Sequence, residues 1–156
     1  MHFTASIDTS QFRAIRTRLV DDVERVAERA VERATKAATE KAKEGRFKDR
    51  TGKLRSEIHP EIEGWDGGTY WGLVISPTAY AGFVEYPTAP HEIVPKGPGY
   101  PLHWVGGKYG PGDHYAHSVS HPGTEGKKFM FGASIVAMTT LRIAIREGFV
   151  GLATVH

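Results

Sequence analysis

The chain contains no cysteine, and this absence excludes several kinds of chemistry. It can form no disulfide bond, present no thiolate nucleophile and hold no cysteine-ligated zinc or iron–sulfur site. The first residues lack a basic stretch followed by an apolar one, so we expect no secretory signal. No apolar run approaches the roughly 20 residues that span a bilayer, and we therefore expect no membrane partner.

Glycine and proline are missing from the start of the chain. All 18 glycines lie at Gly45 or later, and all 9 prolines lie at Pro60 or later. Charge divides in the same way, because residues 1–53 carry a net charge of +4 and residues 54–156 carry −2. The overall charge of +2 is too small to imply a nucleic-acid partner by itself. We predict a single domain, residues 1–156, whose first third differs in structure from the remainder.

The first third has the pattern of one long helix, from about Ser10 to about Glu44. Apolar or small residues recur there in steps that average the helical period of about 3.6. Such a helix is on the order of 50 Å long, which is more than a domain of this size needs to cover its own sheet. Its second half carries a thin alanine stripe that we expect to contact another chain, through Ala30, Ala34 and Ala37. The alternative is a charged helix exposed to solvent.

The rest of the chain reads mainly as short strands and turns. Strands are predicted over residues 54–63, 70–76, 92–95 and 102–105, and Val119 with residues 129–131 supplies a last one. Residues 64–68 form a hairpin loop, and residues 80–86 could be a strand or one to two helical turns. The polar, glycine-rich residues 106–117 are expected to be a loop that is mobile or ordered only by a partner.

A closing helix is predicted over about residues 133–148. Its larger apolar residues fall on one stripe at helical spacing: Ile135, Met138, Leu141, Ile145 and Phe149. The order of elements indicates an α+β fold, with a long N-terminal helix, a twisted antiparallel sheet with long loops over about residues 54–131, and a C-terminal helix packed on the sheet.

Four histidines give the strongest hint of a metal site: His103, His114, His117 and His121. Neutral imidazole is a good zinc ligand, but no carboxylate accompanies these residues in a ligand pattern, and they do not lie on a rigid helix. Surface or hydrogen-bonding histidines are the simpler interpretation, so no metal and no other cofactor is predicted. A hydrogen-bonded or exposed Glu85 is a simpler interpretation than a reactive carboxylate. No nucleophile elbow or Ser/His/Asp set stands out. We predict no catalytic residues.

Basic residues are concentrated between Arg46 and Arg55, where Asp49 is the only acid. We consider this segment a patch that faces a polyanion, formed by Arg46, Lys48, Arg50 and Lys53. The alternative is an ordinary solvated turn. The arginines of the first helix alternate with acids instead, a pattern typical of a salt-bridged face.

Four local signatures occur in a characteristic order. They are DRTGKLRS at residues 49–56, YAGFVEYPT at 80–88, IVPK with LHW at 93–104, and VSHPGT with KFM and an alanine at 119–133. Together they resemble the small neck and tail-completion proteins of tailed bacteriophages, the head–tail joining or minor tail family. The resemblance covers about residues 45–135. Pro87 stands where the family usually has glycine, and Gly132 where it often has proline.

The resemblance implies a structural virion protein of the phage neck or tail top rather than an enzyme. Such proteins form rings, commonly of six copies, that join the head connector to the tail around the DNA channel. The implied neighbours are connector or adaptor, stopper, and tail-terminator or tail-tube proteins, with synthesis in the host cytoplasm. Further candidate contacts are Tyr80, Glu85, Thr88, Tyr109, His114, His117 and His121, and the basic segment would face the channel. Two alternatives stay open: a monomeric DNA-binding accessory protein and a zinc-dependent hydrolase.

Overall fold

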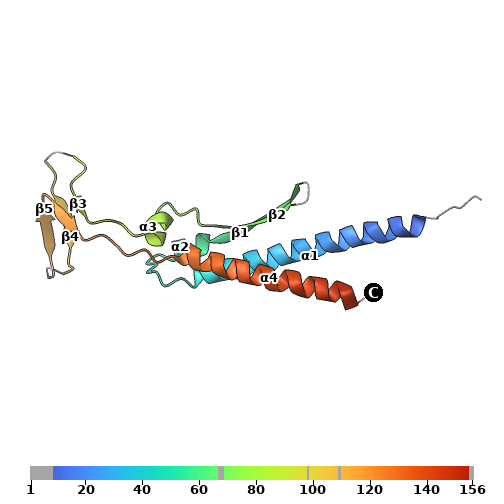
Figure 1. Ribbon diagram of the computed structural model, residues 1–156. Helices are drawn as coiled ribbons and strands as arrows, with labels where there is room; N and C mark the ends of the chain where they lie inside the picture. Colours follow the sequence, from blue (N-terminus) through green and yellow to red (C-terminus); the bar gives the residue numbers. More distant parts are fainter. Residues whose placement is uncertain (1–8, 67–68, 98, 109, 155–156) are drawn as a thin grey trace, which may run out of the picture. The chain divides into compact units, whose positions relative to one another are not determined.

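The computed structural model describes residues 9–66, 69–97, 99–108 and 110–154 (Figure 1). Its contacts group the chain into two compact units, residues 1–81 with 129–156, and the inserted residues 82–128. The mixed α+β class is confirmed. The elements are α1 (Ser10–Lys43), α2 (Lys53–Glu57), β1 (His59–Asp66), β2 (Thr69–Ile75), α3 (Ala81–Glu85), β3 (His91–Ile93), β4 (Leu102–Val105), β5 (Asp113–Ala116), β6 (Val119–His121) and α4 (Phe129–Thr154).

The predicted long helix is confirmed as α1, within one residue at its C-terminal end. Gly45 follows that end because the packing leaves no room for a side chain. A Cβ on Gly45 would lie 2.7 Å from both the Cβ of Phe129 and the ring of Phe47. The rings of Phe47 and Phe129 pack 4.9 Å apart, and both residues are buried. The aromatic pair therefore joins the end of α1 to the start of α4.

The first predicted strand begins too early. Residues 53–57 form the short helix α2, and β1 starts only at His59. Gly52 precedes α2 with a φ of 72°, a conformation that glycine adopts without steric cost. The Asp49 carboxylate accepts the N–H of Arg55 at 2.9 Å, and the Gly52 carbonyl accepts that of Ser56 at 3.0 Å. These local bonds favour a helical turn, and the turn buries Leu54 completely.

The strands form three separate two-stranded antiparallel sheets: β1 with β2, β3 with β6, and β4 with β5. The predicted hairpin of β1 and β2 is confirmed, although residues 67–68 of its turn lie outside the described residues. This hairpin packs on α1. Gly72 of β2 crosses Thr35 so closely that a Cβ would lie 1.8 Å from the threonine Oγ1. A side chain at position 72 would push the hairpin off the helix.

The last predicted strand is wrong, because residues 129–131 are the first turn of α4. Burial of Phe129 against Phe47 starts the helix earlier than the apolar stripe predicts. The helix also runs to Thr154, beyond the predicted end at residue 148. Its main packing partner is α1 rather than a strand (Figure 1). Within the described ranges α4 alone has the length and apolar composition of a membrane span, a weak criterion that soluble core helices also meet. This corrects the statement that no apolar run is so long.

The two long helices meet through small side chains. On α1 the buried face consists of Ala30, Ala34, Ala38 and Ala42, each at most 5% exposed. On α4 the facing residues include Ala133, which is buried, and Gly148, whose Cβ would lie 2.5 Å from a methyl group of Val26. Small residues let helices approach closely. The expectation that Ala30 and Ala34 contact another chain is therefore wrong, because α4 of the same chain covers them; Ala37 is half-buried.

Several large apolar residues of α4 point away from α1. Ile135 is 53% exposed, Met138 58% and Phe149 46%. The predicted stripe therefore exists at the predicted spacing, but most of it does not pack on a sheet. The contact with α1 is occupied by the small residues on the other side of α4. Large apolar residues exposed together on one helix mark an interaction surface, where a partner would bury them.

The inserted residues 82–128 contain two of the three sheets. The prediction of an unstructured loop at residues 106–117 is wrong, because β5 lies there and pairs with β4. Glycines with positive φ turn the chain between these strands: Gly106, Gly107, Gly110 and Gly112. Across the pair the ring of His103 stacks on Tyr115 at 4.8 Å, and Trp104 stacks on His114 at 5.7 Å. Backbone pairing and ring stacking thus order this segment, although its low apolar content predicted a loop.

Candidate assembly surfaces

The basic turn after α1, residues 46–55, contains cations that bond within the chain and cations that do not. The guanidinium of Arg55 donates to the carbonyls of Lys43, Gly45 and Phe47, and it lies 4.3 Å above the centre of the Phe47 ring. Lys53 lies 3.6 Å from the Glu57 carboxylate. Arg55 therefore holds the end of α1 and is not a free surface charge.

Three cations of the same turn remain exposed: Arg46, Lys48 and Arg50. Across the described ranges, no acidic side chain lies within ion-pair distance of them. All four predicted channel-facing residues are thus exposed, and three of them, unlike Lys53, have no acidic partner within ion-pair distance in the described chain.

The predicted histidines take part in bonding within the inserted unit. His103 Nε2 lies 2.7 Å from an Asp113 oxygen, and His114 Nε2 lies 3.1 Å from the Gly110 carbonyl. His121 Nδ1 accepts the N–H of Gly123 at 3.1 Å, whereas His117 is exposed. In the described part of the chain, no three His, Cys, Asp or Glu side chains are grouped to hold a metal ion. Sequence reasoning missed the Asp113 partner, because only the β4–β5 register brings it to His103.

Two of the motif residues act as scaffold. Thr88 and Thr124 exchange backbone hydrogen bonds at 2.9 and 3.1 Å, and their hydroxyls lie 2.8 Å apart. Gly123 has a φ of 84°, and its Cβ would lie 2.2 Å from the Thr88 carbonyl oxygen, so only glycine fits this turn. Glu85 is 7% exposed, so it is poorly placed as a contact for another protein. Of the other predicted contacts, Tyr80 is 40% exposed and Tyr109 lies outside the described residues.

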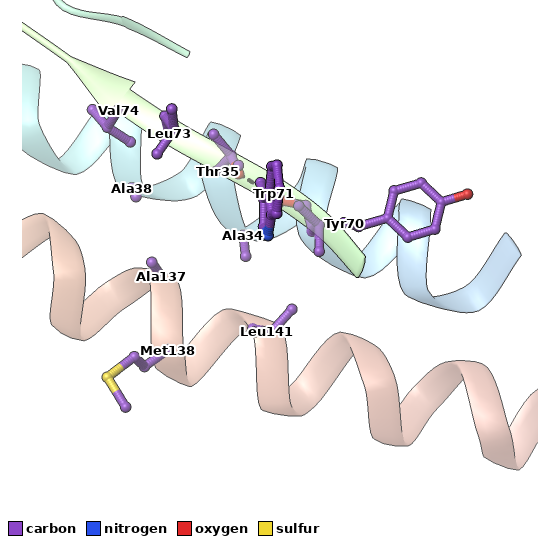
Figure 2. A pocket seen from close by; sticks show the side chains of 12 residues that line it. Ala34, Thr35, Ala38, Tyr70, Trp71, Leu73, Val74, Ala137, Met138 and Leu141 are labelled. Atoms are coloured by element: carbon purple, nitrogen blue, oxygen red, sulfur yellow. Dashed lines mark hydrogen bonds between the residues drawn. The ribbon is translucent and has the colours of Figure 1, made fainter. Parts of the chain in front are cut away.

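An apolar groove of about 340 Å³ lies between β2 and α4 (Figure 2). Its floor is the alanine face of α1, including Ala34 and Ala38. Figure 2 shows Ala137 and Leu141 of α4 pointing toward the strand across the groove. Tyr70, Trp71 and Leu73 line the β2 side. Partial burial of Tyr70, with smaller effects of Glu28 and Glu24, raises the pKa of its hydroxyl. The groove offers a shape for apolar contact and no reactive group.

The outer face of the β1–β2 hairpin combines apolar and acidic side chains. Gly72 of β2 faces Thr35 of α1, so Trp71 and Leu73 lie on the opposite side of the strand. Each is 46% exposed, and both also border the apolar groove. Their cross-strand partners on β1 are Glu63 and Glu61, and residues directly opposite in an antiparallel pair share one face. The face is therefore apolar along β2 and negatively charged along β1. Sequence reasoning missed this surface, because the pattern becomes visible only when the register of the two strands is known.

A second exposed surface lies at the start of α1. Residues 10–20 contain Arg13, Arg16 and Arg18 and no acid, and their exposed apolar residues include Ile15 and Leu19. Figure 1 shows α1 continuing past the C-terminal turns of α4, whose contacts reach back to Val26. This leading segment of α1, residues 10–20, projects beyond α4, which covers the alanine face farther along α1.

Comparison with known proteins gives one family. Residues 10–86 match the model of the HK97-gp10-like family, described as a candidate tail component of bacteriophage HK97. The matched residues span α1, α2, the β1–β2 hairpin and α3, so they contain the basic turn and the hairpin face but not α4. The chain matches no curated protein and no solved structure. The family agrees with the tail-protein resemblance carried by the sequence signatures.

Proposed function

Because residues 10–86 belong to the HK97-gp10-like family of phage tail components, we propose that this chain forms a ring in the virion neck or at the tail top. The ring would join the head connector to the tail and surround the DNA channel. Six copies is the number that the sequence resemblance favours. The neighbours would be connector or stopper proteins on one side, and tail-terminator or tail-tube proteins on the other. A structural role follows from the family; the ring, its copy number and its neighbours are the proposal.

One observation carries the proposal of assembly: α4 exposes a stripe of large apolar side chains. Each such side chain stabilises a complex by roughly 25 cal/mol for every Å² of apolar surface that a partner covers. A stripe of this kind is unusual on a chain that works alone. Neighbouring protein in a virion would supply the cover.

A lipid bilayer is a poorer cover for α4 than protein. At about 100° per residue, Arg142 and Arg146 fall within the same outer stripe as Ile135 and Phe149. Both arginines are exposed, and a charged side chain in the middle of a bilayer is costly. The charge-rich helix α1 also packs along the other side of α4 and would have to enter the lipid with it. These charges therefore argue against α4 as a membrane span, although its length and apolar composition would allow one.

The exposed cations of the basic turn support a place beside DNA. Arg46, Lys48 and Arg50 could attract phosphates without reading a base sequence, as the wall of a DNA channel requires. The same residues would serve the alternative function of a monomeric DNA-binding protein. The two functions differ in whether DNA binding needs the assembled ring.

The proposal is tested with the full chain and with a phage that lacks its gene. Mass photometry should show a species at a multiple of 17.2 kDa, alone or after addition of connector and tail proteins. The phage without the gene should accumulate filled heads and separate tails. A chain that stays monomeric in every mixture, together with normally joined particles, would refute the ring. Salt-sensitive DNA binding by that monomer would support the accessory protein instead.

A further inference from the structure

Residues 10–20 of α1 carry an apolar stripe bordered by arginines. Successive helical residues are about 100° apart, so Ile15 and Leu19 share one side, with Arg16 and Arg18 on its two borders. The side chains are exposed, to 63% for Ile15 and 55% for Leu19. The stripe continues in line to Val26, where α4 begins to cover it. In the described chain the leading part of this stripe projects beyond α4.

The hairpin face has the complementary composition. Trp71 and Leu73 provide exposed apolar surface, with Glu63 and Glu61 directly opposite them on β1. Residues 59–75 contain three acids and no lysine or arginine, whereas residues 10–20 contain three arginines and no acid. Both surfaces thus consist of an apolar centre with charge at its edge, and the two charges have opposite sign.

We propose that residues 10–20 of one copy dock on the outer face of the β1–β2 hairpin of a second copy. Ile15 and Leu19 would cover Trp71 and Leu73, and this burial would supply most of the stability. Arginines border both sides of the stripe, so one of them meets the glutamates of β1 whichever way the helix runs. The charge pairs orient the two copies and speed their encounter.

The occupant must be another molecule, because the hairpin of the same chain lies beside a later part of α1. Gly72 of β2 lies against Thr35, and Pro60 of β1 lines a groove together with Lys43. A continuous helix rises about 1.5 Å per residue and cannot fold its first turns back onto its own flank. Residues 10–20 can therefore reach a hairpin only on a neighbouring copy.

Contact between two different surfaces has a consequence for symmetry. Each copy offers its leading segment to one neighbour and its hairpin to the other, which makes a heterologous interface. Repetition of such an interface gives a closed ring or an open filament. The inference deepens the proposed ring and rests on it for closure, whereas the contact itself is argued from the two surfaces.

Charge exchange in the full chain tests the contact. The pair Arg16→Glu with Arg18→Glu, and the pair Glu61→Arg with Glu63→Arg, should each weaken self-association about tenfold or more. A chain carrying all four changes should regain most of the lost association, because opposite charges face each other again. Arg13→Glu is the matched control for Arg16→Glu, since residue 13 lies about 160° around the helix from Ile15. Sedimentation velocity at low salt, where charge pairs are least screened, measures each variant.

Cross-linking provides a second measurement that does not depend on charge. The chain has no cysteine, so a variant with Leu19→Cys and Leu73→Cys contains only the two introduced thiols. Mild oxidation should link copies head to tail into a ladder of covalent oligomers, whereas either single variant should give no ladder. Arg13→Cys combined with Leu73→Cys is the control and should link poorly.

The outcomes separate this inference from the proposed function. A wild-type ring that shows neither charge rescue nor cross-linking would overturn the contact and leave the ring to another surface. A wild-type chain that is monomeric alone and with virion neck proteins would overturn both. If Arg16→Glu with Arg18→Glu removes DNA binding and leaves association unchanged, the leading segment is a nucleic-acid contact and the inference fails.

Discussion

Gly148 of α4 faces Val26 of α1 so closely that a Cβ would lie 2.5 Å from one valine methyl group. Valine is stiff at χ1 and cannot swing its methyl groups aside freely. The distance between the two long helices therefore depends on a position without a side chain. Because the buried faces of both helices consist of small residues, their large apolar residues are left for other contacts.

We predict that Gly148→Ala destabilises the protein by about 1 kcal/mol, because overpacking outweighs the gain in helix propensity. Gly151→Ala is the matched control on the same helix, since nothing lies within 4 Å of its Cβ position. That variant should be stabilised by up to about 1 kcal/mol. Urea unfolding measures both free energies. Equal stabilisation of the two variants would contradict the close approach of α1 and α4.

Arg55 should matter for stability far more than its exposed neighbours. Arg55→Ala should cost about 2 kcal/mol, because three carbonyls at and just after the end of α1 lose their donor and Phe47 loses its cation contact. Arg55→Lys should rescue only part of the loss, since an ammonium lacks the planar fork. Lys53→Ala, at an exposed ion pair, should change unfolding by less than about 0.5 kcal/mol. A similar loss at positions 53 and 55 would argue against this role.

The outer stripe of α4 should be needed for assembly and not for folding. Ile135→Asp and Met138→Asp leave the thermal unfolding of the monomer nearly unchanged, because both side chains are more than half exposed. They should prevent assembly with neighbouring virion protein by placing a charge in an apolar contact. Ala133→Asp should instead unfold the chain, since that position is only 2% exposed. Normal assembly of the first two variants would show that the stripe stays in solvent.

Neutralising the basic turn should change DNA handling without changing the fold. Replacing Arg46, Lys48 and Arg50 together by Gln is expected to shift unfolding by less than about 0.5 kcal/mol. Particles carrying this variant should form and eject DNA abnormally if the turn lines the channel. Failure to join heads to tails would indicate an acidic protein neighbour instead. Unchanged particle yield and infectivity would make the turn an ordinary solvated surface.

Removal of divalent metal should leave folding and assembly intact. His103, His114 and His121 already have hydrogen-bonding neighbours within the inserted unit, which favours a structural role for them. Thermal unfolding with and without a chelator, together with metal analysis of the purified chain, tests this. Stoichiometric zinc and unfolding on chelation would contradict it and revive the hydrolase alternative.

Local sequence pattern predicted an element correctly where the residues of that element alone determine its structure. The helical period alone placed α1 within one residue, and the hairpin of β1 and β2 followed from alternation around glycines. Local pattern failed at residues 53–57 and 113–116. In the first case the Asp49 and Gly52 hydrogen bonds favour a helix, and in the second only pairing with β4 makes a strand.

The face that α4 buries was decided by tertiary structure alone. Its sequence has two apolar sides, one with Ala133 and Gly148 and one with Ile135 and Phe149, and burial of larger residues is ordinarily favoured. The alanine face of α1 selects the small side, because only small residues allow two helices to approach so closely. The acidic hairpin face likewise needs the register that sets Glu61 opposite Leu73. The sequence by itself predicted the two long helices and a resemblance to phage tail proteins, and residues 10–86 match a tail-component family. Packing between distant segments determined which surfaces remain for partners.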